Sequence, residues 1–374
     1  MNKVSQQVNF AGISMKNPVV VASGTYGFGR EYGQFYDLSE LGGICCKGLT
    51  LAPREGNPPP RVAETPMGIL NSVGLQNPGV DAFIAQELPE LRKHDVKIIA
   101  NISGNTPEEY GIMCQKLSDA GVDMIEVNVS CPNVKCGGLQ YGVVPEMTAE
   151  VTEVAKKHST VPVMVKLSPN VTDIVSIAQS VEAEGADAVS LINTLVGMRI
   201  DVNTRRPILK MNTGGLSGPA VLPVAVRMVW EVANVVQIPV LGMGGIATGE
   251  DAAQMMLAGA SAVAVGTANF VDPYAPLQVR DELAREKEKE PDTAEIAARL
   301  GESKEAVAQA LEAIVEPISL FEPVYSENGD SIYIIDQLSD NSVSDERWLE
   351  NIALRDAMSK LSERERGIIE MRFY

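Results

Sequence analysis

The chain has few residues of the kinds that would tie it to a membrane or a nucleic acid. No apolar run approaches the roughly 20 residues of a membrane-spanning helix, and the N-terminus lacks the basic and apolar regions of a secretory signal. Basic residues are in deficit, since the 374 residues carry a net charge of −18. This balance argues against general binding to phosphate backbones or anionic membrane surfaces. We expect a cytoplasmic protein that holds any phosphate group in a local site.

Paired cysteines are also missing. The chain has five cysteines and no C-x-x-C spacing, namely Cys45, Cys46, Cys114, Cys131 and Cys136. An odd number without paired spacing favours reduced thiols over a disulfide framework, and it disfavours a zinc or iron–sulfur site. We therefore predict no bound metal.

Eight short apolar runs rich in β-branched residues alternate with helix-like segments. They cover residues 19–23, 42–49, 97–103, 124–129, 161–167, 188–193, 238–243 and 262–266. Continuous apolar strands between amphipathic helices are typical of a parallel sheet, and eight such units predict an α/β fold, a (β/α)8 TIM barrel. A doubly wound sheet is the alternative. Helices are expected to begin at Thr106, before Pro107, and at Thr172, before Asp173.

Nearly every run ends in a polar or glycine-rich group, which favours the barrel. Barrel enzymes build their sites from the carboxyl ends of many strands, whereas an open sheet binds its ligand at one switch point. The glycine-rich ends at 242–246 and 265–267 predict close backbone approach to a phosphate, although tight turns also use glycine. Lys47 and Lys166 each close an apolar strand and are expected to meet an anion, or else a structural salt-bridge partner.

The segment Asn128-Val129-Ser130-Cys131-Pro132-Asn133 follows the fourth run and is the strongest candidate for an active site. Cys131 lies among amides with no histidine nearby in the sequence, which suits proton transfer at a carbon acid better than acyl transfer. The alternative is a buried structural cysteine.

Several ordered motifs carry a resemblance to a known family over about residues 1–276. They are Ala22-Ser23-Gly24-Thr25-Tyr26-Gly27, Lys47-Gly48-Leu49-Thr50, Gly56-Asn57-Pro58-Pro59-Pro60-Arg61, the stretch 71–79, Asn128 to Asn133, Lys166-Leu167-Ser168-Pro169-Asn170, Leu191-Ile192-Asn193-Thr194 and Gly214-Gly215-Leu216-Ser217-Gly218-Pro219. In these motifs the chain resembles the catalytic subunit of class 1, subclass 1B dihydroorotate dehydrogenases.

The resemblance implies oxidation of (S)-dihydroorotate to orotate in de novo pyrimidine (UMP) biosynthesis, with FMN as cofactor. Cys131 would take a proton from C5 while a hydride passes from C6 to the flavin, and Lys166 would stabilise the reduced flavin. The implied FMN contacts are Ser23, Lys47, Gly48, Asn101, Asn128, Lys166, Ile192, Gly218, Gly244, Gly245, Gly266 and Thr267. The implied substrate contacts are Lys47, Asn71, Ser72, Val73, Gly74, Leu75, Asn128, Asn193 and Thr194, with Asn133 as a further contact.

The resemblance also implies a partner. Residues 134–138 are similar to subclass 1B, although Cys136 departs from the usual pattern. The expected partner is an electron-transfer subunit that carries FAD and a 2Fe–2S cluster and passes electrons to NAD, in a heterotetramer with two copies of each subunit. A fumarate-using enzyme of subclass 1A is the alternative.

A different composition begins after about Pro276. Residues 277–374 carry a net charge of −11, against −7 for residues 1–276. Segment 293–311 predicts a helix-turn-helix, and segments 317–325, 336–340 and 357–366 resemble sporulation-type RNA polymerase sigma factors. We predict a barrel domain at 1–276 and an incomplete, mostly helical, sigma-factor-like segment at 277–374.

This second segment has three possible origins: a genuine fusion, a recombined or misassembled gene product, and a neutral replacement of the last barrel helix. We favour the second, and we expect no binding to nucleic acid or RNA polymerase because the segment is acidic and lacks a recognition helix. The rival functional hypothesis is a transcription-related binding protein. Residues 277–290 are expected to form a helix that covers the barrel flank. With Leu277, Val279 and Leu283 as its few apolar residues, this helix is expected to pack less completely and to weaken FMN retention.

Overall fold

A computed structural model of the protein describes residues 6–129, 141–284, 323–327, 330–333, 360 and 362. The chain divides into two compact units, Met1–Lys287 and Glu288–Tyr374. Nearly all of the described residues belong to the first unit, which contains the sites discussed below.

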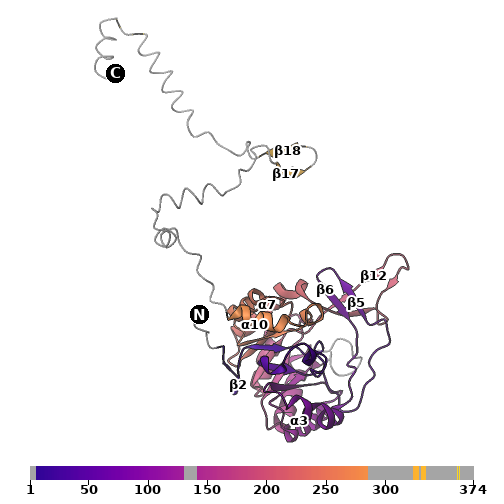
Figure 1. Ribbon diagram of the computed structural model, residues 1–374. Helices are drawn as coiled ribbons and strands as arrows, with labels where there is room; N and C mark the ends of the chain where they lie inside the picture. The colour runs from indigo at the N-terminus through magenta and orange to yellow at the C-terminus, as the bar shows by residue number, and fades with distance from the viewer. Residues whose placement is uncertain are drawn as a thin grey trace. The chain divides into compact units, whose positions relative to one another are not determined.

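Eight parallel strands close a barrel in the first unit, as the sequence predicts (Figure 1). Each predicted run contains one of them: β3 (Val19–Val21), β4 (Gly43–Cys45), β7 (Lys97–Ile102), β8 (Met124–Asn128), β9 (Val163–Lys166), β10 (Ala188–Leu191), β15 (Val240–Met243) and β16 (Ala262–Val265). Hydrogen bonds link them in the order β3-β4-β7-β8-β9-β10-β15-β16, and β16 returns to β3. The doubly wound alternative is therefore wrong.

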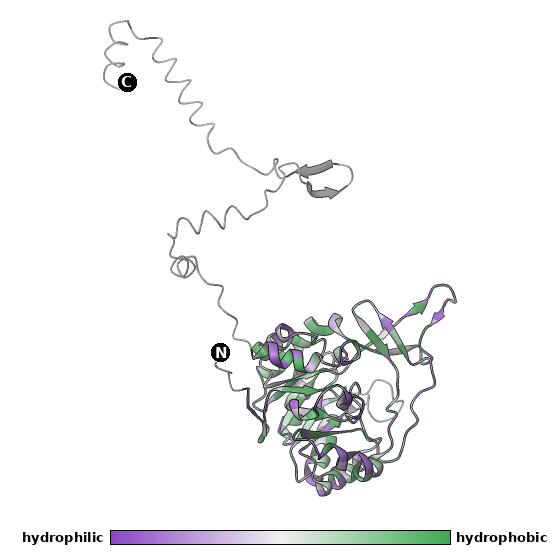
Figure 2. Cartoon of the chain, in the orientation of Figure 1, coloured by the Kyte–Doolittle hydropathy of each residue, from purple (hydrophilic) through white to green (hydrophobic). Residues whose placement is uncertain are grey.

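Helices surround the strands. The longer ones are α3 (Pro107–Ala120), α5 (Pro145–His158), α6 (Ile174–Ala183), α7 (Leu222–Ala233), α8 (Gly249–Leu257) and α10 (Ala275–Leu283). Shorter ones are η1 (Tyr32–Gln34), η2 (Leu38–Glu40), α1 (Val80–Ala82), the π-helix η3 (Phe83–Glu87), α2 (Leu88–Leu91), η4 (Pro219–Val221) and α9 (Ala268–Val271). The helices mix hydrophilic and hydrophobic residues (Figure 2).

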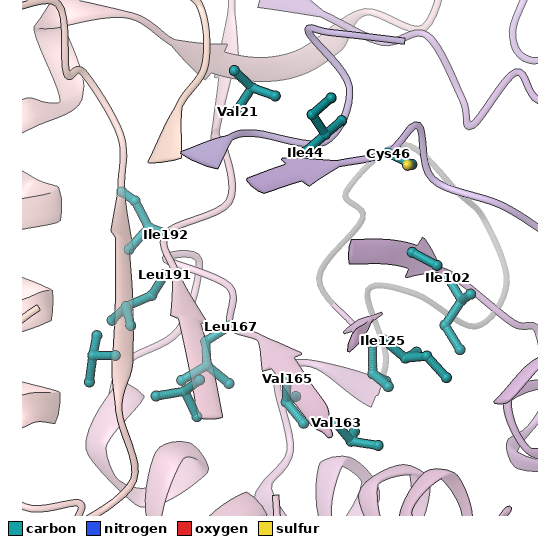
Figure 3. Close-up of a cluster of buried hydrophobic side chains, with 14 of the residues drawn as sticks. Val21, Ile44, Cys46, Ile102, Ile125, Val163, Val165, Leu167, Leu191 and Ile192 are labelled. Carbon is teal, nitrogen blue, oxygen red and sulfur yellow. The ribbon is translucent and has the colours of Figure 1, made fainter. Parts of the chain in front are cut away.

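The main core lies between the strands and these helices. Figure 3 shows strand side chains such as Ile44, Ile125 and Val165 in this layer, and all three are fully buried. Cys46 belongs to the same layer, whereas its neighbour Cys45 belongs to a second cluster inside the barrel. Successive residues of a strand face opposite sides of the sheet, which explains this division.

A β-hairpin closes the amino end of the barrel. It consists of β1 (Val8–Phe10) and β2 (Ile13–Met15), which pair antiparallel. Phe10 and Met15 are almost fully buried in the interior cluster, together with Val20, Met124 and other strand residues. With this end plugged by Phe10 and Met15, the interior of the barrel opens towards the carboxyl ends of the strands.

Side-chain caps start several helices. Thr106 accepts a hydrogen bond from the backbone of Glu109 and caps α3, as predicted. At α6 the cap is Asp173, which accepts from the backbone N–H groups of Val175 and Ser176, so the prediction that Thr172 caps this helix is wrong. The carboxylate of Asp173 also places a negative charge at the positive end of the helix.

A four-stranded antiparallel sheet projects from the barrel mouth (Figure 1). Its strands, in spatial order, are β11 (Leu195–Met198), β14 (Thr213–Ser217), β6 (Gly68–Asn71) and β5 (Val62–Thr65). The small hairpin β12 (Ile200–Asp201) and β13 (Arg206–Pro207) lies between β11 and β14 in the chain. The sequence analysis did not predict this sheet.

Helix α10 covers the barrel beside β3 and α8, which confirms the expected helix over residues 277–283, whereas residues 285–290 lie outside the described residues. Val279 is fully buried, and Leu277 and Leu283 pack against the core. In the second unit the structure describes the backbone of one hairpin, β17 (Pro323–Glu327) and β18 (Asp330–Tyr333). The predicted helix-turn-helix at 293–311 lies outside the described residues.

Candidate active site

A cavity of about 430 Å³ opens at the carboxyl ends of the barrel strands. Strand-end residues form its floor, and Val62, Ile69 and Leu216 of the projecting sheet contribute to its wall. The structure brings together, in its lining, all the residues predicted to contact the cofactor: Ser23, Lys47, Gly48, Asn101, Asn128, Lys166, Ile192, Gly218, Gly244, Gly245, Gly266 and Thr267.

The described residues that were predicted to contact the substrate line the same cavity, with one exception. Asn71, Val73, Gly74, Leu75, Asn193 and Thr194 contribute to the lining, in addition to Lys47 and Asn128. Ser72 does not: it is fully buried, and its hydroxyl has no hydrogen-bond partner among the described residues. Side chains alternate along an extended segment, so Ser72 points away from the side that Asn71 and Val73 present.

The predicted catalytic residue, Cys131, lies outside the described residues, as do Ser130, Asn133 and Cys136. Its role as a base and the contact from Asn133 stay predictions. Asn128 and Val129, which precede this segment, are described and buried. The described chain therefore reaches the cavity wall at Asn128, three positions before Cys131 in the sequence.

The cavity is cationic although the chain is acidic. Among the described residues that line it, the charged ones are Lys47 and Lys166, and none is a carboxylate. Lys166 is only 5% exposed and forms no ion pair with the described part of the chain. A buried ammonium that has no ion pair among the described residues is costly, so this side of the cavity is suited to an anionic ligand.

Amide side chains form a second feature of the lining. Asn193 Nδ2 donates to Asn128 Oδ1 over 3.4 Å, and the backbone N–H of Thr194 donates to Asn193 Oδ1 over 2.8 Å. Asn170, outside the lining, fixes the neighbouring backbone because its Nδ2 donates to the Thr194 carbonyl. Amides offer donors and acceptors side by side, which suits a heterocycle with alternating N–H and C=O groups.

Glycine-rich turns form a third feature. Gly244 and Gly245 have φ values of +124° and +81°, in the region that L side chains rarely adopt. A Cβ on Gly245 would lie 2.7 Å from the backbone nitrogen of Leu222, so the two segments approach closely there. After the neighbouring strand β16, Thr267 Oγ1 donates to Ser217 Oγ over 2.8 Å. Turns of this kind direct backbone N–H groups at phosphates in other barrels.

Sequence reasoning missed a buried glutamate directly below the cavity. Glu126 is fully buried inside the barrel, where Asn101, Ser190 and Cys45 all donate hydrogen bonds to its carboxylate. The sequence analysis counted this residue as part of an apolar strand. An acidic residue in an otherwise apolar buried strand was the signal that could have identified it.

The described residues offer neither a metal site nor a membrane-spanning helix. No group of three or more His, Cys, Asp or Glu residues in the part of the chain that the structure describes is arranged to hold a metal ion. No helix within that part is long and apolar enough to cross a membrane.

Two family models match the chain. The model described as dihydroorotate dehydrogenase matches residues 5–286, and the model described as Sigma-70 region 3 matches residues 277–342. The two matches overlap on helix α10. The second match agrees with the resemblance of the C-terminal segment to sigma factors.

Curated relatives are similar over most of the barrel unit. A protein named dihydroorotate dehydrogenase B (NAD(+)), catalytic subunit, from Alkaliphilus metalliredigens is 58% identical over 279 residues, which are 75% of this chain and 92% of the relative. A protein of the same name from Geobacillus kaustophilus is 59% identical over 275 residues, 73% of this chain and 87% of the relative.

A solved structure shares the fold. It is described as a crystal structure of DHODH in complex with ferulenol from Eimeria tenella, and it superposes with a TM-score of 0.64 at 23% sequence identity. The superposition covers 75% of this chain and 83% of that one.

Proposed function

Because the chain belongs to the dihydroorotate dehydrogenase family, we propose that its barrel oxidises (S)-dihydroorotate to orotate in pyrimidine biosynthesis, with FMN as the bound cofactor. The observation that carries this proposal is the cavity at the carboxyl ends of the strands, whose described charged residues are two lysines surrounded by amides.

The cavity and its described lining residues fit FMN in four respects. The turns at Gly244 and Gly245 suit a phosphate, and the buried ammonium of Lys166 suits a ring system that gains negative charge. Asn101 Oδ1 is a buried acceptor without a partner among the described residues, so it is free to accept from a ring N–H. The cavity volume of about 430 Å³ lies in the usual range for ligand sites.

FMN, when bound, would supply the hydride acceptor for C6 of dihydroorotate. Asn71, Asn128 and Asn193 would hold the pyrimidine ring by its N–H and C=O groups, since all three contribute amides to the lining. We propose that Cys131 removes the proton from C5, because the segment that carries it begins at the cavity wall after Asn128. Lys166 would stabilise negative charge on the bound ring.

We further propose that electrons leave through a partner subunit. The relatives named as catalytic subunits of a B-type, NAD(+)-linked enzyme support this route. The finer parts of the proposal are an FAD/2Fe–2S electron-transfer subunit, a heterotetramer with two copies of each chain, and a cytoplasmic location. Turnover with NAD should require the partner, whereas fumarate should not restore turnover to the isolated chain.

Anaerobic reduction by dihydroorotate tests the function. We expect the absorbance of oxidised flavin in the purified chain to bleach within a single turnover, and the rate in Cys131→Ala to fall by about 10²-fold or more. Cys136→Ala is the matched control, a second thiol of the same segment that should leave the rate near wild type. A wild-type chain that binds FMN but is not reduced by dihydroorotate would exclude the proposed reaction.

A further inference from the structure

Glu126 is a buried acidic residue that has no role in the ligand binding or the proton transfer proposed above. It lies on β8 inside the barrel, is fully buried and does not line the cavity. No ion pair links it to a described Lys, Arg or His. Burying a carboxyl group is costly unless it is hydrogen-bonded. The buried position of Glu126 therefore requires hydrogen-bond donors from the surrounding strands.

Three donors from three other strands compensate it. Ser190 Oγ on β10 donates to Oε1 over 2.6 Å. Asn101 Nδ2 on β7 donates to Oε2 over 2.5 Å, and Cys45 Sγ on β4 donates to the same oxygen over 3.0 Å. Burial raises the pKa of the Cys45 thiol well above its ordinary value, and the nearby Glu126 adds to this rise, so the thiol stays protonated and remains a donor. Both oxygens of the Glu126 carboxylate thus accept hydrogen bonds.

The contact with Asn101 determines which end of its amide faces the ligand. Asn101 lines the cavity, and its Nδ2 is committed to Glu126 below. Its Oδ1 is therefore turned to the other side, where it is buried without a partner among the described residues. Gly48, another lining residue, lies close to this oxygen, since a Cβ added there would be 2.8 Å from it.

A carboxamide is nearly symmetric in shape, so packing alone would not choose between its two orientations. Glu126 makes the choice, because the flipped amide would place Oδ1 against the carboxylate and leave two acceptors facing each other. We propose that Glu126 is a positioning residue that keeps the oxygen of Asn101, and not its nitrogen, directed at the bound cofactor. This inference rests on the proposed flavin site, and oxidised flavin offers a ring N–H that such an acceptor would bind.

Four variants test the role of Glu126. Glu126→Leu removes the acceptor that orients Asn101, and Asn101→Asp places two acceptors against each other. The double variant Asn101→Asp with Glu126→Gln restores the pattern, because the introduced amide donates to one oxygen of the introduced carboxylate and leaves the other oxygen for the cofactor. Met164→Leu is the control, since Met164 is buried inside the barrel and pairs with Glu126 in the strand register.

The first measurement is the dissociation constant of FMN on apoprotein, with the flavin absorption spectrum as a second readout. We expect the dissociation constant to rise at least about tenfold in Glu126→Leu and in Asn101→Asp, which corresponds to the loss of one strong hydrogen bond. The double variant should recover most of the affinity and the spectrum of the wild type, and the Met164→Leu control should retain both.

The outcomes separate this inference from the proposed function. A wild-type chain that takes up no FMN would overturn both. If the wild type binds FMN, unchanged affinity in Glu126→Leu would overturn the positioning role alone. If Glu126→Leu fails to fold, as judged by circular dichroism, the double variant decides: affinity no better than that of Asn101→Asp overturns the inference, and rescue supports it.

Discussion

Glu282 accepts a hydrogen bond from the backbone N–H of Gly249 over 2.5 Å, so helix α10 supplies an additional acceptor at the N-terminus of helix α8. The first N–H groups of a helix have no partner within it, and a carboxylate there also interacts favourably with the helix dipole. Gly249 is the first residue of α8, and its own turn is capped by Thr248 through a capping box with Asp251. The last helix of the barrel unit is therefore joined to its neighbour by a specific polar contact.

We predict that Glu282→Ala lowers the stability of the barrel unit by about 1 kcal/mol, the usual cost of losing a helix cap. The change is measurable as a lower midpoint of chemical unfolding. Asp281→Ala is the matched control, because Asp281 is an exposed neighbour whose ion pair with Arg280 is a surface contact of little value. Equal midpoints for Glu282→Ala and Asp281→Ala would contradict the capping role.

Helix α10 also bears on where the barrel domain ends. The compact unit extends to Lys287, and the family match to residue 286, whereas the sequence analysis divided the chain at residue 276. We predict that a chain of residues 1–287 binds FMN as tightly as the full chain. A chain of residues 1–276 should fail to fold stably, because it lacks the buried Val279 and the packed Leu277 and Leu283.

Thermal unfolding with and without FMN distinguishes the two truncations. Each fully buried aliphatic side chain contributes about 1.5–3 kcal/mol, so the shorter chain loses a large share of a typical domain's stability. A stable, flavin-binding 1–276 chain would support the earlier boundary and make α10 dispensable. Precipitation of the 1–287 chain would instead show that the second unit supports the barrel.

The sequence was informative where one local signal decided the structure. Runs such as 163–165 and 262–265 are continuous and apolar, so each predicts a strand buried on both sides, and eight of them predict the barrel. Because the barrel strands are parallel, their carboxyl ends place the lysines and amides on one rim of the barrel. For this reason, the residues predicted to contact the cofactor lie together in one cavity.

The parts that sequence reasoning missed depend on partners far apart in the chain. The projecting sheet pairs Asn71 with Gly215, and no periodicity in either short segment reveals the other. Glu126 meets Cys45 across 81 positions of sequence and Ser190 across 64. The burial of Ser72 likewise follows from its alternation with Asn71 and Val73, which a motif match does not resolve.

Replacing Lys166 is expected to change the stability of the apoprotein and the affinity for FMN in opposite directions. We expect Lys166→Met to stabilise the apoprotein by about 1 kcal/mol or more, because it removes a buried charge that has no ion pair with the described residues. The same change should weaken FMN binding at least about tenfold, since the charge that compensates the cofactor is lost. Unfolding midpoints of apoprotein and FMN titrations measure the two effects.

Lys210→Met is the control for this pair of measurements. Lys210 is exposed and lies outside the cavity, so its loss should alter neither quantity. Lower stability of the Lys166→Met apoprotein would show that the ammonium is compensated within the protein. Its role as the counter-charge of a ligand would then be excluded.

Buried thiols make the barrel sensitive to alkaline pH. Burial raises the pKa of Cys114 to about 12, and burial together with nearby Glu87 raises the pKa of Cys46 to about 12, against 9.0 for an exposed thiol. Below pH 9.0 both states of the chain keep these protons, so the full stability is present. As the pH rises from 9.0 towards about 12, the unfolded thiol ionises while the folded one stays protonated, and stability is lost.

We predict that Cys114→Ala reduces this alkaline loss. Each such thiol contributes up to about 1.4 kcal/mol per pH unit within the window, so the variant should be less stable than the wild type at pH 8 but approach it at pH 10. Unfolding by denaturant at pH 8, 9 and 10 measures the slope. Ser118→Ala is the control, because Ser118 lies on the same helix and is buried, but does not titrate, so its curve should run parallel to the wild type. A parallel curve for Cys114→Ala as well would mean that the folded Cys114 thiol ionises as readily as the unfolded one.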